Sequence, residues 1–248
     1  MNSVIIVAAG NSTRMGTGQN KQFICLNNIP VIVRTLKAFS GLPEIHSITV
    51  VTRECDIETM LNYINEYKIP KVTSVIKGGD TRQESVLCGL KAQSLSDNDN
   101  ILIHDGARPF IHKEHILAVI GALNSGKYKA AAVGVPPKDT IKQVDDEGII
   151  VNTPDRSSLI SIQTPQGFKF GLIMKAHLEA DSKGISVTDD CAVAEAVTNE
   201  KIKVIEESGT KIVPMSDELR QEVRDASKGV TEEIRHSVSK DIVDAYVE

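Results

Sequence analysis

The sequence predicts an α/β protein built on an open, mainly parallel twisted sheet with helices on both faces. Three observations lead to this class. Short apolar runs rich in β-branched residues recur along the chain, as at 4–7, 46–52 and 72–76. Segments with apolar residues at helical spacing separate these runs. A loop of small residues and glycine follows the first run. Strands that alternate with helices are typical of parallel sheets with right-handed crossovers, so a Rossmann-like arrangement is expected.

The elements follow in order from the N-terminus. Strand 4–7 precedes the glycine loop, and Val4 to Val7 are all apolar, as in a strand buried on both faces. The pattern then predicts helix 30–39, strand 46–52, helix 56–67, strand 72–76, a helix capped by Asp80 or Thr81, and strands 100–105, 130–135 and 202–205.

Three further segments differ from this alternation. Two β-prone runs, 139–144 and 148–153, are joined by three acidic residues and predict a protruding β-hairpin arm within 137–156. A lone hairpin is marginal in water, so a second subunit is one surface on which it can rest. Thr188 is expected to cap a helix, and 214–248 is expected to form a charged helical tail.

Composition limits the possible functions. The 248 residues, 41% of them hydrophobic, suffice for one globular domain spanning 1–248. A net charge of -5 argues against nucleic acid or an anionic membrane as a partner, so a polyanionic ligand needs local cations. The four cysteines form no C-x-x-C pair, and no segment resembles a signal peptide or a membrane span. A cytoplasmic protein is therefore expected.

The loop after the first strand is expected to bind phosphate. Ala8, Ala9 and Gly10 let a ligand approach the backbone, and Arg14 and Lys21 add two positive charges. The spacing matches neither the dinucleotide fingerprint nor the P-loop. The alternative is a surface loop whose two cations are simply solvated.

Two later segments also combine a glycine turn with charged or polar groups. Gly78-Gly79-Asp80-Thr81 runs into a helix that contains Ser85, and a capped turn without function is the alternative there. Asp105, Gly106 and Arg108 end a buried strand, where ligands of open α/β sheets bind. Asp105 is a candidate ligand for Mg²⁺ or a substrate hydroxyl, and a structural Asp105–Arg108 pair is the alternative. His112 and His115 lack a third ligand and indicate a solvated helix start.

Four motifs resemble those of the 2-C-methyl-D-erythritol 4-phosphate cytidylyltransferase family, within the sugar-phosphate nucleotidyltransferases, over about residues 3 to 206. The motifs are Gly10-x-x-x-Arg14-Met15-Gly16-x-x-x-x-Lys21-Gln22, Gly78-Gly79-x-x-Arg82-x-x-Ser85, Asp105-Gly106-Ala107-Arg108-Pro109 and Gln163-Thr164-Pro165-Gln166-x-Phe168. The resemblance implies transfer of CMP from CTP to the sugar-alcohol phosphate in non-mevalonate isoprenoid synthesis, with Mg²⁺ or another divalent cation and a homodimer held through the arm.

The resemblance also assigns roles to residues. It implies that Arg14 and Lys21 are catalytic. It implies that the nucleotide is bound by Ala8, Ala9, Gly10, Gly79, Asp80 and Ser85, and the acceptor by Asp105, Arg108, Thr140, Arg156, Thr164 and Lys211. Lys211 is only the nearest equivalent of the family's lysine, because the chain departs from the family pattern after Gly209. Ribitol-5-phosphate cytidylyltransferase and a non-catalytic nucleotide-binding homologue remain alternatives, and the missing glycine fingerprint argues against a dinucleotide oxidoreductase.

Overall fold

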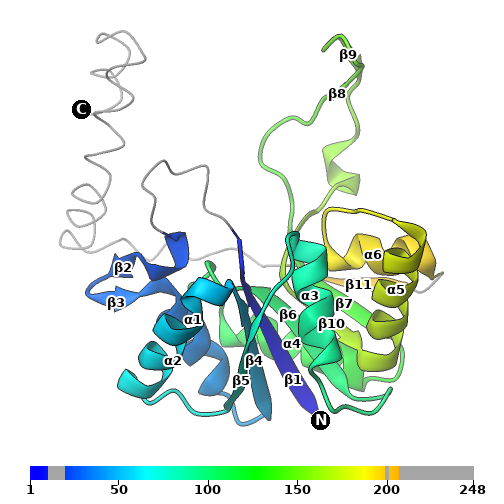
Figure 1. The fold of residues 1–248 in the computed structure, drawn as a ribbon. Coiled ribbons are helices and arrows are strands. Elements are labelled where there is room, and N and C mark those ends of the chain that lie inside the picture. The colour runs from blue at the N-terminus through cyan, green and yellow to red at the C-terminus, as the bar shows by residue number, and fades with distance from the viewer. Residues whose placement is uncertain (11–19, 199–200, 207–248) are drawn as a thin grey trace, which may run out of the picture. The chain divides into compact units, whose positions relative to one another are not determined.

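A computed structural model describes residues 1–10, 20–198 and 201–206. Its centre is a seven-stranded sheet with the order β11-β7-β10-β6-β1-β4-β5 (Figure 1). The strands are β1 (Asn2–Ala8), β4 (Ser47–Thr52), β5 (Val72–Lys77), β6 (Asn100–Asp105), β7 (Ala130–Val135), β10 (Ser161–Lys169) and β11 (Ile202–Glu206). Every neighbouring pair is parallel except those of β10, which runs antiparallel to both β6 and β7. The predicted mainly parallel α/β sheet is confirmed.

Six α-helices accompany the sheet in the described residues. They are α1 (Val31–Ser40), α2 (Ile57–Glu66), α3 (Arg82–Lys91), α4 (Lys113–Asn124), α5 (Phe170–Lys183) and α6 (Asp190–Val197). Side chains on a strand alternate between the two faces of a sheet. Ile103 and Phe168 belong to the core shared with α3, α5 and α6. Their neighbours in sequence face the other side of the sheet: His104 packs against Phe39 of α1, and Gly167 lies against Val119 and Leu123 of α4. Helices therefore cover both faces, as the sequence predicts.

The core under α3 brings that helix close to the sheet. Ile5, Val51 and Ile103 pack there with Val86 and Leu90, all fully buried. Burying a side chain of this size stabilises the fold by roughly 1.5 to 3 kcal/mol. The N-terminal turn of α3 is consequently held at the carboxyl edge of the sheet, beside the ends of β1 and β6.

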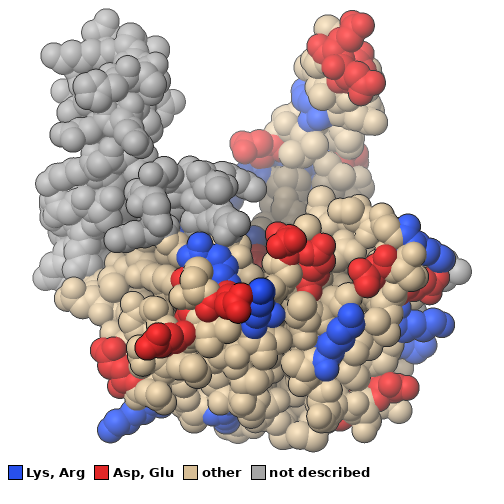
Figure 2. Space-filling model, viewed as in Figure 1, with Lys and Arg blue, Asp and Glu red and all other residues tan. Residues whose placement is uncertain are grey.

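The predicted arm is present but its ladder is short. Only β8 (Gln143–Val144) and β9 (Ile150–Asn152) pair, and the Asp145 side chain closes the turn by accepting from the backbone N–H groups of Glu147 and Ile149. The arm extends away from the sheet (Figure 1), and Figure 2 shows an acidic tip. Five apolar side chains of the arm are exposed, namely Ile141, Val144, Ile149, Ile150 and Val151.

Two local expectations need correction. Thr188 does not cap α6, because Asp189 is the N-cap residue and its carboxylate accepts from the backbone N–H of Ala192. Two neighbouring residues, Thr188 and Asp189, are both good caps, and the structure uses the carboxylate. Neither β10 nor α5 was among the expected elements, because the string around Gln163-Thr164-Pro165 has little periodicity.

The chain divides into two compact units, Met1–Ile24 with Pro30–Ser208 and Cys25–Ile29 with Gly209–Glu248. The described part of the second, Cys25–Ile29, holds strand β2 (Cys25–Leu26) and the first residue of β3 (Ile29–Pro30), with Asn27 and Asn28 at positive φ between them. The predicted helical tail 214–248 and Lys211 lie outside the described residues. A single domain over 1–248 therefore stays a prediction. Among the described residues, no helix is both long and apolar enough to cross a membrane.

Candidate active site

Loops from four parallel strands meet at the carboxyl edge of the sheet. The backbone N–H of Gly106, after β6, donates to the carbonyl of Val7 in β1 at 2.8 Å. The N–H of Gly78, after β5, donates to the carbonyl of Thr52 in β4 at the same distance. The first bond holds the loop after β6 against β1, and the second holds the loop after β5 against β4. Because β1 and β4 are paired, the ends of all four strands lie together, at the position where open α/β sheets bind ligands.

The predicted nucleotide-binding residues after β1 and β5 come together. A Cβ atom at Gly78 would lie 2.6 Å from the Ser85 hydroxyl oxygen and 2.8 Å from the Ala9 Cβ, so only glycine fits between these two residues. Gly79 and Asp80 continue the same turn into α3, and Asp80 is exposed. Ala8 is buried at the end of β1, and Gly10 is exposed beyond it. The structure thus assembles a small-residue surface from segments about 70 positions apart.

Helix α3 begins with a complete capping box. The Thr81 hydroxyl accepts from the backbone N–H of Glu84, and the Glu84 carboxylate accepts from the N–H groups of Asp80 and Thr81. The capped turn is therefore present, and the cap fixes the backbone of Asp80 and Thr81. Nucleotide binding by this turn stays a prediction.

Lys21 lies between two anchored residues. It opens the short 3-10 helix Lys21–Phe23, and its side chain is exposed. On one side, the buried Asn20 amide donates to Asp56 at 3.1 Å, and on the other the buried Gln22 amide donates to the Ala8 carbonyl at 2.5 Å. These contacts fix the backbone of Lys21 beside the end of β1. Arg14 lies outside the described residues.

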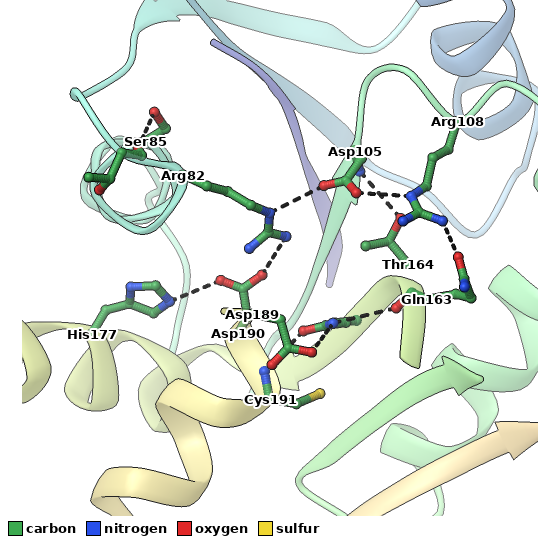
Figure 3. Close-up of polar contacts among 12 residues, drawn as sticks. Arg82, Ser85, Asp105, Arg108, Gln163, Thr164, His177, Asp189, Asp190 and Cys191 are labelled. Carbon is green, nitrogen blue, oxygen red and sulfur yellow. Dashed lines mark hydrogen bonds and ion pairs between the residues drawn. The ribbon is translucent and has the colours of Figure 1, made fainter. Parts of the chain in front are cut away.

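Asp105 is held from two sides by arginines (Figure 3). Its Oδ2 accepts from Nε of Arg108 at 2.9 Å, and its Oδ1 accepts from Nε of Arg82 at 3.3 Å. Burial alone would raise the pKa of this carboxyl group, but the two guanidinium groups hold the pKa below its usual value. The Asp105–Arg108 pair that the sequence left as an alternative exists, and the carboxylate is still 30% exposed at the edge of the sheet.

Gln163 and Thr164 of β10 contact the turn that carries Asp105 and Arg108. Ile162 pairs with Gly134 and Gln166 with Ala132, so a bulge between them frees Gln163 and Thr164 from the ladder. The Thr164 hydroxyl accepts from the backbone N–H of Asp105 at 3.4 Å, and Arg108 donates to the Gln163 side chain. The Thr164-Pro165 peptide is cis. Thr164 thus lies beside Asp105, and its predicted contact with the sugar phosphate stays a prediction.

Five residues form an acidic–basic cluster of linked ion pairs, namely Arg82, Asp105, Arg108, His177 and Asp190. Three of them, Arg82, His177 and Asp190, were not among the predicted site residues. Nη2 of Arg82 lies 2.8 Å from Oδ2 of Asp190, and Nε2 of His177 lies 3.2 Å from Oδ1 of the same carboxylate (Figure 3). Arg82 stands inside the Gly-Gly-x-x-Arg-x-x-Ser motif and Asp190 follows Thr188-Asp189, so the sequence offered a signal for both. It offered none for His177, which lies in an unpredicted helix.

Thr140 and Arg156 lie apart from this cluster within one chain. Both are exposed on the arm, and Nη1 of Arg156 donates to the carbonyl of Lys138 at 2.6 Å. No group of three or more His, Cys, Asp or Glu side chains suited to a metal occurs among residues 1–10, 20–198 and 201–206. His112 is exposed at the N-cap of α4, as expected for a solvated helix start.

The fold and these residues define a class: a Rossmann-like α/β protein with a mainly parallel sheet, whose glycine turns and acidic–basic cluster share one edge of the sheet. Comparison with known proteins narrows this class. Residues 2–220 match the family model described as 2-C-methyl-D-erythritol 4-phosphate cytidylyltransferase. The chain belongs to this family.

Individual relatives agree. The cytidylyltransferase of this name from Clostridium acetobutylicum is 42% identical over 200 residues, 80% of this chain and 86% of the relative. That from Clostridium novyi is 44% identical over 196 residues, covering 79% and 83%. The structure of 4-diphosphocytidyl-2C-methyl-D-erythritol synthase from Anaerococcus prevotii is similar with a TM-score of 0.72 at 33% identity, covering 83% of this chain and 88% of that one. The Francisella tularensis cytidylyltransferase has a TM-score of 0.71 at 28% identity, covering 90% and 98%.

Proposed function

We propose that the protein transfers CMP from CTP to 2-C-methyl-D-erythritol 4-phosphate, giving 4-diphosphocytidyl-2-C-methyl-D-erythritol and pyrophosphate. Family membership supports this reaction. The observation that carries it is the convergence of the Ala9–Gly78–Ser85 surface and Asp105 at one edge of the sheet, next to anchored Lys21. The reaction is expected in the cytoplasm.

The chemistry requires positive charge above all. An oxygen of the acceptor phosphate bonds to the α-phosphorus of CTP, while the bond from that phosphorus to the bridging oxygen breaks and pyrophosphate leaves with the electron pair. The attacking phosphate is already ionised, so no general base is needed. Lys21 and Arg14 neutralise the charge that grows on the α-phosphoryl oxygens and the leaving group.

The role of Lys21 is testable by substitution. Removing one such charge commonly lowers turnover about a hundredfold or more, because it acts on charge that develops in the transition state. Lys21→Ala is expected to lose about this much kcat at saturating substrates, whereas Lys91→Ala, on the exposed end of α3, is the matched control. Near-normal turnover of Lys21→Ala would remove Lys21 from the mechanism.

Asp105 fits as one ligand of a divalent cation. Mg²⁺ in nucleotide enzymes is usually held by one or two carboxylates together with substrate phosphates. Asp105 is partly exposed, and each of its two carboxylate oxygens accepts from one arginine. Each oxygen therefore keeps a second lone pair that can bind a metal ion. Bound there, the ion would neutralise phosphate charge. The other proposed role of Asp105 is to accept from a substrate hydroxyl, and Asp105→Asn separates the two because only the metal role changes the Mg²⁺ dependence.

The arm is proposed to complete the acceptor site in a homodimer. Its apolar side chains are 41% to 60% exposed, which is costly unless another surface covers them. Arg156 and Thr140 would then bind the acceptor phosphate of the partner's site. Arg156→Ala is expected to raise the KM for the sugar phosphate while leaving the KM for CTP unchanged, and equal effects on both would contradict this assignment.

Pyrophosphate release tests the proposed function as a whole. The purified chain is incubated with CTP, Mg²⁺ and either 2-C-methyl-D-erythritol 4-phosphate or ribitol 5-phosphate. Release with the erythritol phosphate, at a kcat/KM at least tenfold above that with ribitol phosphate, is the expected result. The reverse preference would favour the ribitol enzyme, and no release with either would favour a non-catalytic homologue.

A further inference from the structure

The carboxylate of Asp190 is the most deeply placed charge in the cluster. Its side chain is 1% exposed at the first residue of α6. The preceding residue, Asp189, already caps this helix, so the Asp190 carboxylate is not needed as the cap. A buried carboxylate costs several kcal/mol of desolvation, and replacing a buried ion pair by apolar groups is often neutral or stabilising. Stability alone is therefore a weak reason for a charge at this position.

Arg82 connects Asp190 to the site through different nitrogen atoms. Nη2 lies 2.8 Å from Asp190 Oδ2, and Nε lies 3.3 Å from Asp105 Oδ1, so one planar guanidinium group bridges two carboxylates (Figure 3). The shorter contact is with the buried partner. The Nε–Asp105 contact is a hydrogen bond and the Nη2–Asp190 contact a buried ion pair, so the guanidinium group is held between the two carboxylates and Asp190 fixes its inner side.

His177 fixes the other oxygen of Asp190. It is fully buried on α5, and its Nε2 donates to Asp190 Oδ1 at 3.2 Å. The carboxylate is thus oriented by a helix on one side and by Arg82 on the other. A path of three contacts leads from α5 through Asp190 and Arg82 to Asp105.

Of the two arginines that contact Asp105, Arg108 is the more exposed. Its side chain is 46% exposed, against 31% for Arg82; it belongs to the same turn as Asp105 and also donates to Gln163 of β10. Arg82 comes from α3, an element anchored in the core. Without Asp190, the Arg82 side chain would lose its shorter contact, and the orientation of the Asp105 carboxylate would depend on the more exposed Arg108.

We propose that Asp190 is a positioning residue for the cytidylyltransferase site: with His177 behind it, it holds Arg82 in the place from which Arg82 orients the Asp105 carboxylate. This proposal rests on the proposed function, since Asp105 is the group that meets the substrate or its metal ion. Residues that orient a ligand in this way commonly contribute about tenfold to a hundredfold to activity.

A double-mutant cycle tests the proposal. Asp190→Asn keeps the shape of the side chain but removes its charge. It is expected to lower kcat/KM for CTP about tenfold or more, and Asp105→Asn is expected to lower the same kinetic parameter. Because both substitutions act through Asp105, the double variant is expected to lose no more than Asp105→Asn alone. A purely structural role predicts multiplied losses, and multiplied losses or an unchanged Asp190→Asn would overturn the proposal.

Matched variants keep the result interpretable. Glu179→Gln on α5 removes a partly exposed carboxylate outside the cluster and should leave kcat and KM unchanged. If Asp190→Asn fails to fold, Arg82→Lys takes its place in the same cycle, because a lysine keeps the charge but does not bridge both carboxylates.

A readout independent of activity separates this proposal from the proposed function. In the wild-type protein, the Nε–H proton of Arg82 is expected to give an NMR signal protected from exchange with water, and Asp190→Asn should abolish that protection. Persistent protection would overturn the proposal even in an active enzyme. If the wild-type chain is inactive but its Arg82 signal is protected and Asp190→Asn abolishes that protection, the result counts against the proposed function alone.

Discussion

Acidification should destabilise the protein through His104, the residue before Asp105. His104 is fully buried in β6 beside Phe39, with 4.9 Å between ring centroids, and its Nε2 donates to the carbonyl of Arg108 at 3.1 Å. Burial lowers the pKa of this imidazole from 6.5 to about 4. The side chain therefore stays neutral in the folded state at pH values where it is protonated in the unfolded chain.

The size of the effect follows from this difference. One pKa unit corresponds to about 1.4 kcal/mol, so the full interval from 6.5 to about 4 corresponds to about 3.4 kcal/mol. The unfolded state binds more protons throughout this interval, so stability is retained above pH 6.5 and falls as the pH drops toward 4. Between pH 7 and pH 5, His104 alone should cost about 2 kcal/mol of unfolding free energy.

Urea unfolding of matched variants isolates this contribution. His104→Gln can still donate from an amide to the Arg108 carbonyl but does not titrate, whereas His112→Gln, at an exposed position, is the control. The difference in unfolding free energy between wild type and His104→Gln should shift by about 2 kcal/mol from pH 7 to pH 5. A shift below about 0.5 kcal/mol would refute the assignment of this pH dependence to His104.

Three further predictions concern the surroundings of the site. Thr81→Ala removes the N-cap of α3 and should lower the unfolding free energy by about 1 kcal/mol in urea, with Thr81→Ser nearly neutral; equal losses would contradict a capping role. Gly78→Ala places a Cβ against Ser85 and should raise the KM for CTP but not for the acceptor, and an unchanged KM would argue against a nucleotide surface there. Burial raises the pKa of the Cys191 thiol, so iodoacetamide should label exposed Cys55 well before Cys191, and comparable rates in the native protein would contradict this burial.

Local patterns were sufficient for most elements and for several site residues. The β-branched run of β1, the helical spacing of α1 and α2, and the Thr81 cap each depend on neighbours in sequence, and the structure has all of them. The glycine turns at Gly78 and Gly106 lie at strand ends for the same reason. The roles of Arg14 and Lys211 stay predictions, because these residues lie outside the described part of the chain.

Long-range pairing explains what local patterns missed. Strand β10 lies between β6 and β7 and runs against both, although its sequence has no clear strand period. Its bulge brings Thr164 to Asp105, 59 positions away in sequence. The choice of Asp189 rather than Thr188 as a helix cap likewise involves a distant partner, because Asp189 also accepts from the Gln166 side chain.

The sequence by itself determined the α/β alternation, the glycine turn after β5, and the acid and arginine at the end of β6, because each depends on a short stretch of neighbouring residues. A phosphate-binding loop with Arg14 and Lys21 stays a prediction from the sequence. Only the tertiary structure decided that Asp105 shares Arg82 with a buried Asp190, and that His177 stands behind them. The physical reason is that a buried charge is tolerated only where partners from α3, α5 and α6 converge, and convergence of distant helices is a property of packing rather than of sequence spacing.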